Sequence, residues 1–187
     1  NFLAYPNDTM LYDSEKIIEK VKKLTNLKIV FRPHPINRIF FKGNFENIYV
    51  NRLISKYSND KRVTFDFSED YSKSYSDSTL MITDISATAF TYSFLTFNPV
   101  LFYSPKESLF KRDYKKLHHF KDRKKIGIVV YNIKNFSNSF KKLLLHRKKY
   151  IFSIKSVRSQ IDYIGKSKTK TIKSIEEVLD GKYDKFL

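Results

Sequence analysis

The feature that most constrains this fold is a run of small residues between two apolar segments, within residues 79–103. Residues 80–82 are apolar enough for a short buried strand, residues 84–88 are small or polar, and residues 90–95 are bulky and apolar. A second apolar strand is predicted over residues 100–103. Strand, tight turn, helix and strand form a βαβ unit, which joins two parallel strands by a crossover. The pattern therefore predicts a parallel α/β sheet.

The turn of this unit has the features of an anion-binding site. Ser86 is a typical helix N-cap, and we expect Ala87, Thr88 and Ala89 to offer the free N–H groups of the first helical turn. Small side chains let an anion approach the backbone, and the helix dipole favours a phosphate there. Asp84 would orient the loop amides or contact a sugar hydroxyl. Two alternatives stay open. Asp84 could only provide a favourable negative charge near the helix N-terminus, and Ser86 could only cap the helix.

A second polar motif, Arg32-Pro33-His34-Pro35, follows the continuous apolar run of residues 27–31. Such a run predicts a strand buried in a parallel sheet, and two prolines end it abruptly. Ligands of open parallel sheets bind outside the carboxyl ends of the strands, where both motifs fall. Arg32 is therefore a candidate donor-binding residue. His34 is a candidate catalytic residue that stabilises charge on a leaving phosphate, although it could equally fasten a tight turn.

The remaining hydrophobic periodicity predicts alternating strands and helices, with no internal repeat or linker. We therefore expect one domain, residues 1–187, with a doubly wound Rossmann-like parallel sheet. The further strands are predicted over residues 2–5, 63–67 and 126–131. The further helices are predicted over residues 14–24, 47–57, 136–144 and 171–179, with a weaker helical pattern at Tyr71 and Tyr75.

Composition limits the partners of the chain. Lys and Arg number 36 against 19 Asp and Glu, a net charge of +17, which favours anionic partners unless the excess only forms a solvated face. The chain has no cysteine and shows no cluster of metal ligands, so we predict no metal and no cofactor. No membrane-spanning run or signal peptide is evident, so a cytoplasmic location is expected. The basic run of residues 141–150 indicates a peripheral contact with the inner face of the membrane, or a solvated helix.

Three stretches taken together resemble the CDP-glycerol glycerophosphotransferases of teichoic-acid and capsule synthesis. Residues 32–35 are similar to an (R/K)-x-H-P strand end, residues 82–86 to I-T-D-[YF]-S-S, and residues 99–103 to a K-P-V-x-F-Y strand. Residues 164–167 resemble the closing segment of the family. The resemblance implies a GT-B architecture of two Rossmann-like halves, and this chain resembles the C-terminal half, which binds the nucleotide donor. An N-terminal half is then expected outside this chain.

The resemblance implies that His34, Asp84 and Ser86 lie at the pyrophosphate or donor site. The chain departs from the family at the second serine of the turn, which is Ala87 here, with Thr88 next to it. The implied activity is transfer of a glycosyl or polyol-phosphate group from a nucleotide-activated donor, with a CDP-linked donor favoured, to a surface-glycan or capsule acceptor. The isolated domain is expected to bind nucleotide and to turn over poorly.

Two other classes of function stay open. A sugar-nucleotide epimerase of GT-B architecture would use the same helix N-terminus but release an isomerised sugar without an acceptor. A basic domain that binds polyanions or nucleic acid would also explain the charge of +17. The transferase interpretation, in contrast, includes no nucleic acid among its partners.

Overall fold

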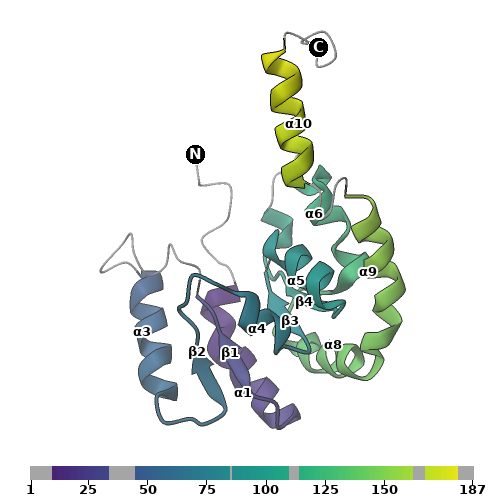
Figure 1. The fold of residues 1–187 in the computed structure, drawn as a ribbon. Helices are drawn as coiled ribbons and strands as arrows, with labels where there is room; N and C mark the ends of the chain where they lie inside the picture. Colours follow the sequence, from purple (N-terminus) through teal and green to yellow (C-terminus); the bar gives the residue numbers. More distant parts are fainter. Residues whose placement is uncertain (1–9, 34–44, 85, 110–113, 162–166, 181–187) are drawn as a thin grey trace.

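The structure is a computed structural model that describes residues 10–33, 45–84, 86–109, 114–161 and 167–180 (Figure 1). The described strands form two parallel sheets, with the orders β1-β2 and β3-β4-β5. Their bounds are β1 Ile29–Phe31, β2 Val63–Phe65, β3 Met81–Thr83, β4 Val100–Tyr103 and β5 Gly127–Val130. The prediction of a parallel α/β fold is thus confirmed, but the described strands belong to two sheets and not to the single one expected. The strand predicted over residues 2–5 lies outside the described residues.

Helices separate these strands in the sequence, as the periodicity predicted. The α-helices are α1 Ser14–Leu24, α3 Phe45–Tyr57, α4 Ser72–Ser76, α5 Thr88–Thr96, α6 His118–Lys121, α7 Arg123–Ile126, α8 Ile133–His146, α9 Tyr150–Ser159 and α10 Ser167–Leu179. The 3-10 helices are η1 Met10–Asp13, η2 Glu107–Leu109, η3 Tyr114–Lys116 and η4 Arg147–Lys149. The sequence analysis missed α9, and it predicted no elements for the segment that contains α6 and α7.

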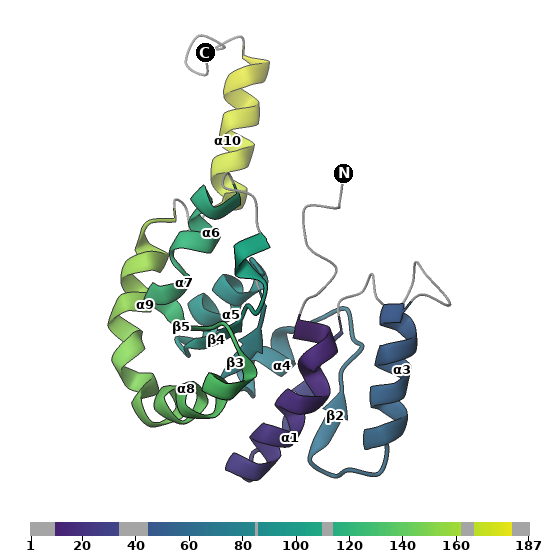
Figure 2. The ribbon, with the colours of Figure 1, turned by 180° about the vertical axis from the view of Figure 1, so that it is seen from behind.

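Strand β4 is the centre of the larger sheet, and its four residues are all buried. Side chains alternate between the faces of a strand, so β4 serves two cores. Leu101 and Tyr103 pack with side chains of α1 and α8, while Val100 and Phe102 pack with side chains of α5, α7 and α9. Figure 2 shows these helices on both sides of the sheet. Because helices cover both faces of β4, residues 100–103 form a continuous apolar run.

The smaller sheet is covered less completely. Helix α1 packs against both sheets, because Ile17 faces the larger core whereas the adjacent Ile18 contacts Leu53 of α3 and Val63 of β2. The middle residue of β1, Val30, is 45% exposed. The β1–β2 pair therefore has one packed face and one open face.

Helix α10 stands away from the rest of the molecule in both views of the ribbon (Figures 1 and 2). It begins at Ser167, four residues earlier than the helix predicted over residues 171–179. Its apolar side chains Ile172, Ile175 and Leu179 are exposed.

Candidate functional site

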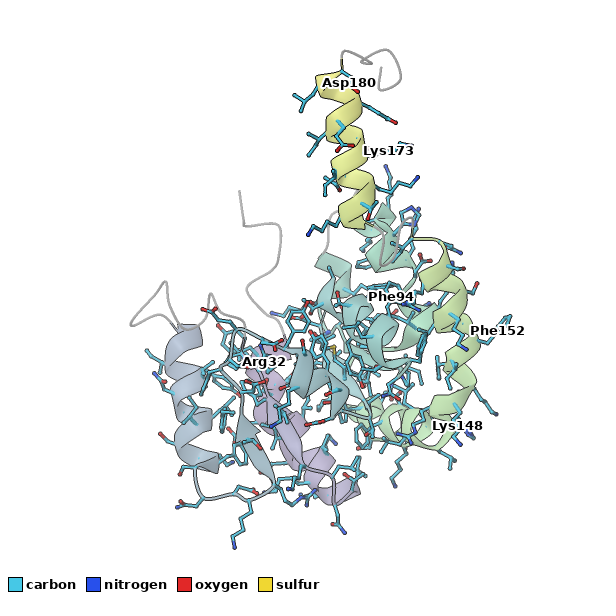
Figure 3. All side chains as sticks on the ribbon, in the orientation of Figure 1. Arg32, Phe94, Lys148, Phe152, Lys173 and Asp180 are labelled. Carbon is cyan, nitrogen blue, oxygen red and sulfur yellow. The ribbon has the colours of Figure 1, made fainter. Side chains whose placement is uncertain are left out.

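The two polar motifs of the sequence follow the carboxyl ends of strands in different sheets. Arg32 comes directly after β1, and Asp84 comes directly after β3. The short helix α4 lies between the two sheets, and Figure 3 shows Arg32 close to this boundary. The contacts of α4 therefore decide whether the two motifs belong to one site.

Arg32 is held by the segment that follows β2. Its guanidinium forms an ion pair with Asp66 and donates hydrogen bonds to the Ser68 hydroxyl at 3.1 Å and the Ser68 carbonyl at 2.8 Å. Ser74 on α4 donates to the same Asp66 carboxylate. About a quarter of the Arg32 side chain (25%) stays exposed. The guanidinium is thus fixed in place but remains reachable from solvent.

Asp66 is the acceptor at the centre of this cluster. Burial by itself would raise the pKa of the Asp66 carboxyl. Hydrogen bonds from Ser74 and Ser68, together with Arg32, outweigh burial and hold its pKa well below the usual range. Asp66 is therefore ionised at neutral pH, and its ion pair holds the Arg32 guanidinium in position.

Tyr75 on α4 connects this cluster to the second motif. It is 7% exposed, and its ring packs edge-on against Tyr92 of α5, with 5.5 Å between the ring centroids. Burial raises the pKa of the Tyr75 phenol, although the Thr88 side chain and the charge of Arg32 act in the opposite direction. Helix α4 is therefore linked to Arg32 through Ser74 and Asp66, and it packs against α5 through Tyr75 and Tyr92.

The N-terminus of α5 differs from its prediction. The helix begins at Thr88, with Ala87 as the preceding residue, and the Ser86 hydroxyl accepts a hydrogen bond from the Thr88 N–H at 3.3 Å. The Ala89 N–H donates to the Ser86 carbonyl at 3.3 Å. Two of the three N–H groups predicted to be free are thus used inside the turn, because the chain tightens one residue before the helix. The expectation of three free donors was wrong.

What this turn offers to solvent is a pair of hydroxyl groups. The Ser86 and Thr88 side-chain oxygens lie 2.7 Å apart, and Ala87 and Thr88 are exposed. One of these hydroxyls donates to the other here, and both could donate to an anion by turning their O–H groups outward, where the helix dipole favours negative charge. Compared with a backbone cradle, this site depends more on side chains.

The predicted site residues within the described part of the chain lie at three places. Arg32 lies beside α4, while Ser86, Ala87 and Thr88 lie at the start of α5. Asp84 is half-buried in the loop after β3. His34 lies outside the described residues, so its role stays a prediction.

Sequence reasoning missed the residues that join the two motifs. These are Asp66, Ser68, Ser74 and Tyr75. A signal was present, because Asp66 and Ser68 lie at the carboxyl end of the strand predicted over residues 63–67, at the same edge where Arg32 was placed.

No known family model, curated protein or solved structure matches the chain. In the described part of the chain, no three His, Asp or Glu side chains gather where they could hold a metal ion. No described helix combines the length and the apolar character needed to cross a bilayer.

Proposed function

We propose that this chain is the donor-binding domain of a transferase that uses a nucleotide-activated donor. The observation that carries the proposal is the connection through α4: Ser74 donates to Asp66, the partner of Arg32, and Tyr75 packs against Tyr92 of the helix that begins at Thr88. A site shared by the carboxyl ends of two sets of parallel strands is where α/β proteins bind nucleotides.

The donor diphosphate would contact groups from both motifs. The Ser86 and Thr88 hydroxyls would donate to one phosphate, with the N-terminus of α5 behind them. The exposed edge of Arg32 would contact the other phosphate, and Asp66 would keep the guanidinium in position. His34 would stabilise the charge that develops on the leaving nucleotide diphosphate.

The transferred group would be a glycosyl or a polyol phosphate, and the acceptor a surface glycan. These assignments rest on the resemblance to CDP-glycerol glycerophosphotransferases, which also favours a CDP-linked donor. The acceptor and the general base are assigned to a second domain, so this chain alone is expected to bind without efficient turnover. Rapid transfer by the isolated chain would contradict that division of roles.

Calorimetric titration with CDP, UDP, GDP and CMP at moderate salt tests the proposal. We expect selective binding of one diphosphate, weakened at least about tenfold in the double variant Ser86→Ala with Thr88→Val, because each lost hydroxyl removes a charge-assisted hydrogen bond. The matched control is Ser156→Ala with Thr64→Val, two exposed hydroxyls on α9 and β2. His34→Ala, with exposed His118→Ala as its control, tests the residue that lies outside the described part.

The alternatives predict other outcomes of the same experiment. Weak binding of all four nucleotides that disappears with salt and ignores both double variants would indicate a polyanion-binding domain and reject the donor site. Selective binding followed by isomerisation of a nucleotide sugar without an acceptor would indicate an epimerase. Product analysis after incubation with nucleotide sugars separates these results.

A further inference from the structure

The longest acid-free part of this sequence coincides with one side of the molecule. Residues 123–161 contain eleven Lys or Arg residues and no Asp or Glu. They include β5 and the helices α8 and α9, which meet at η4. Figure 3 shows Lys148 and Phe152, both labelled, on the outer side of this region and pointing away from the core. Arg123 and Lys125, at the start of this stretch, are paired with Glu107 and Asp122, whereas the lysines of α8, η4 and α9 have no carboxylate within their own segment.

We call the exposed part of this region the α8–α9 surface. It consists of Lys141, Lys142, Leu145, Lys148, Lys149, Phe152 and Lys155, all exposed. In the described part of the chain none of these lysines is in an ion pair, whereas Lys22, Lys56 and Lys125 elsewhere are paired with carboxylates. Unpaired lysines on one face are available to an anionic partner.

Two large apolar side chains stand among these lysines. Leu145 is 77% exposed and Phe152 is 83% exposed. Neither belongs to the core, because the inward positions of the same two helices are filled by Phe140, Leu143 and Ile154, each at most 2% exposed. Leu145 lies three residues after Lys142 and four after Lys141 on α8, and Phe152 lies three residues before Lys155 on α9. That spacing places these neighbours on one helix face. Lys148 and Lys149 lie in η4, which joins the two helices.

We infer that the α8–α9 surface binds the surface of a bilayer that contains anionic lipids. Each lysine near such a surface adds attraction to the headgroups. Leu145 and Phe152 would enter the boundary between headgroups and acyl chains, as apolar residues of interfacial helices do. A nucleic acid would also attract the lysines, but Leu145 has no aromatic face for base stacking. Lipid therefore fits both components of the surface, and this inference does not depend on nucleotide binding.

Co-sedimentation of the full chain with vesicles tests the inference. We expect binding to equimolar phosphatidylcholine and phosphatidylglycerol, weakening as salt rises, and none to phosphatidylcholine alone. Lys148→Gln with Lys149→Gln should reduce the affinity about fivefold for each lysine. Leu145→Ser with Phe152→Ser should reduce it at least about tenfold. The matched control is Ile48→Ser with Leu179→Ser, which changes exposed apolar residues on α3 and α10.

A single fluorophore distinguishes insertion from adsorption. The chain has no tryptophan, so Phe152→Trp introduces the only one. We expect a blue shift and quenching by brominated lipids on anionic vesicles, and neither effect for Ile48→Trp. No vesicle binding would overturn the inference. Binding that is unaffected by Leu145→Ser with Phe152→Ser, without quenching of Phe152→Trp, would also overturn it and indicate a polyanion surface.

Discussion

The two sheets of this protein are stabilised in different ways. In the β3-β4-β5 sheet, Leu101 and Phe102 are both 0% exposed and lie in separate apolar cores. In the β1–β2 sheet, Val30 is 45% exposed, and polar contacts such as Arg32 with Asp66 and Lys22 with Asp60 connect the chain segments. The larger sheet is therefore stabilised by apolar cores on both faces, whereas the smaller sheet combines one apolar core with contacts between charged groups.

The candidate site uses groups from both sheets. Charged side chains that hold the smaller sheet, Arg32 and Asp66, are the same ones that reach α4 and the start of α5. The larger sheet provides a rigid position for Ser86 and Thr88. A ligand that contacts both motifs would therefore stabilise the β1–β2 sheet more than the β3-β4-β5 sheet.

The largest effect is expected from Leu101→Ala. Removing a fully buried leucine should lower the free energy of unfolding by about 2–5 kcal/mol. Val30→Ala, at the middle of β1, should lower it by less than about 1 kcal/mol because Val30 is already half exposed. Urea denaturation of both variants measures the contrast. Equal losses would show that the two sheets are packed alike.

The next largest loss of stability is expected from Gly127→Ala. A Cβ at this position would lie 1.8 Å from the Val100 carbonyl oxygen, so β5 would have to move away from β4. The backbone is extended, and the cost comes from space alone. We expect a loss of about 1–3 kcal/mol in urea denaturation, as for other overpacked sites. Thr64→Ala on β2 is exposed and should change stability by less than about 0.5 kcal/mol.

Asp66→Asn should weaken the smaller sheet selectively. An amide in place of the carboxylate turns one N–H₂ group toward Arg32, Ser74 or Ser68, which are donors themselves. We expect a local loss of about 1–3 kcal/mol. Hydrogen exchange should show faster exchange for amides of β1 and unchanged exchange for β4. The exposed Asp77→Asn is the control, and faster exchange in both sheets would refute the contrast.

A smaller difference in stability between the two sheets is expected at acidic pH. Folding lowers the pKa of Asp66 and of Asp60, which accepts a hydrogen bond from Lys22. Stability from such groups is complete above the usual carboxyl range and is lost as the pH falls through their lowered pKa values. Below about pH 4 we therefore expect faster hydrogen exchange in β1 before β4. If both sheets lost protection from hydrogen exchange at the same pH, this order would be contradicted.

Much of the fold could be predicted because the determining signals are local. Apolar runs marked the strands at residues 27–31 and 100–103, and helical periodicity marked α1 and α8. Helix α9 was missed, although Ile154 and Val157 have the spacing of one helix face. The separation into two sheets was also missed, since strand periodicity does not encode which strands pair.

By itself the sequence determined that polar motifs follow apolar strands, with small residues before a helix and an excess of basic residues. The tertiary structure alone shows that Arg32 pairs with Asp66, 34 residues away, and that Tyr75 packs against Tyr92. It also decided that Leu145 and Phe152 face outward among lysines. The physical reason is that spacing along the chain sets the local conformation and the face of each helix. Contacts between distant residues depend on how complete elements pack together.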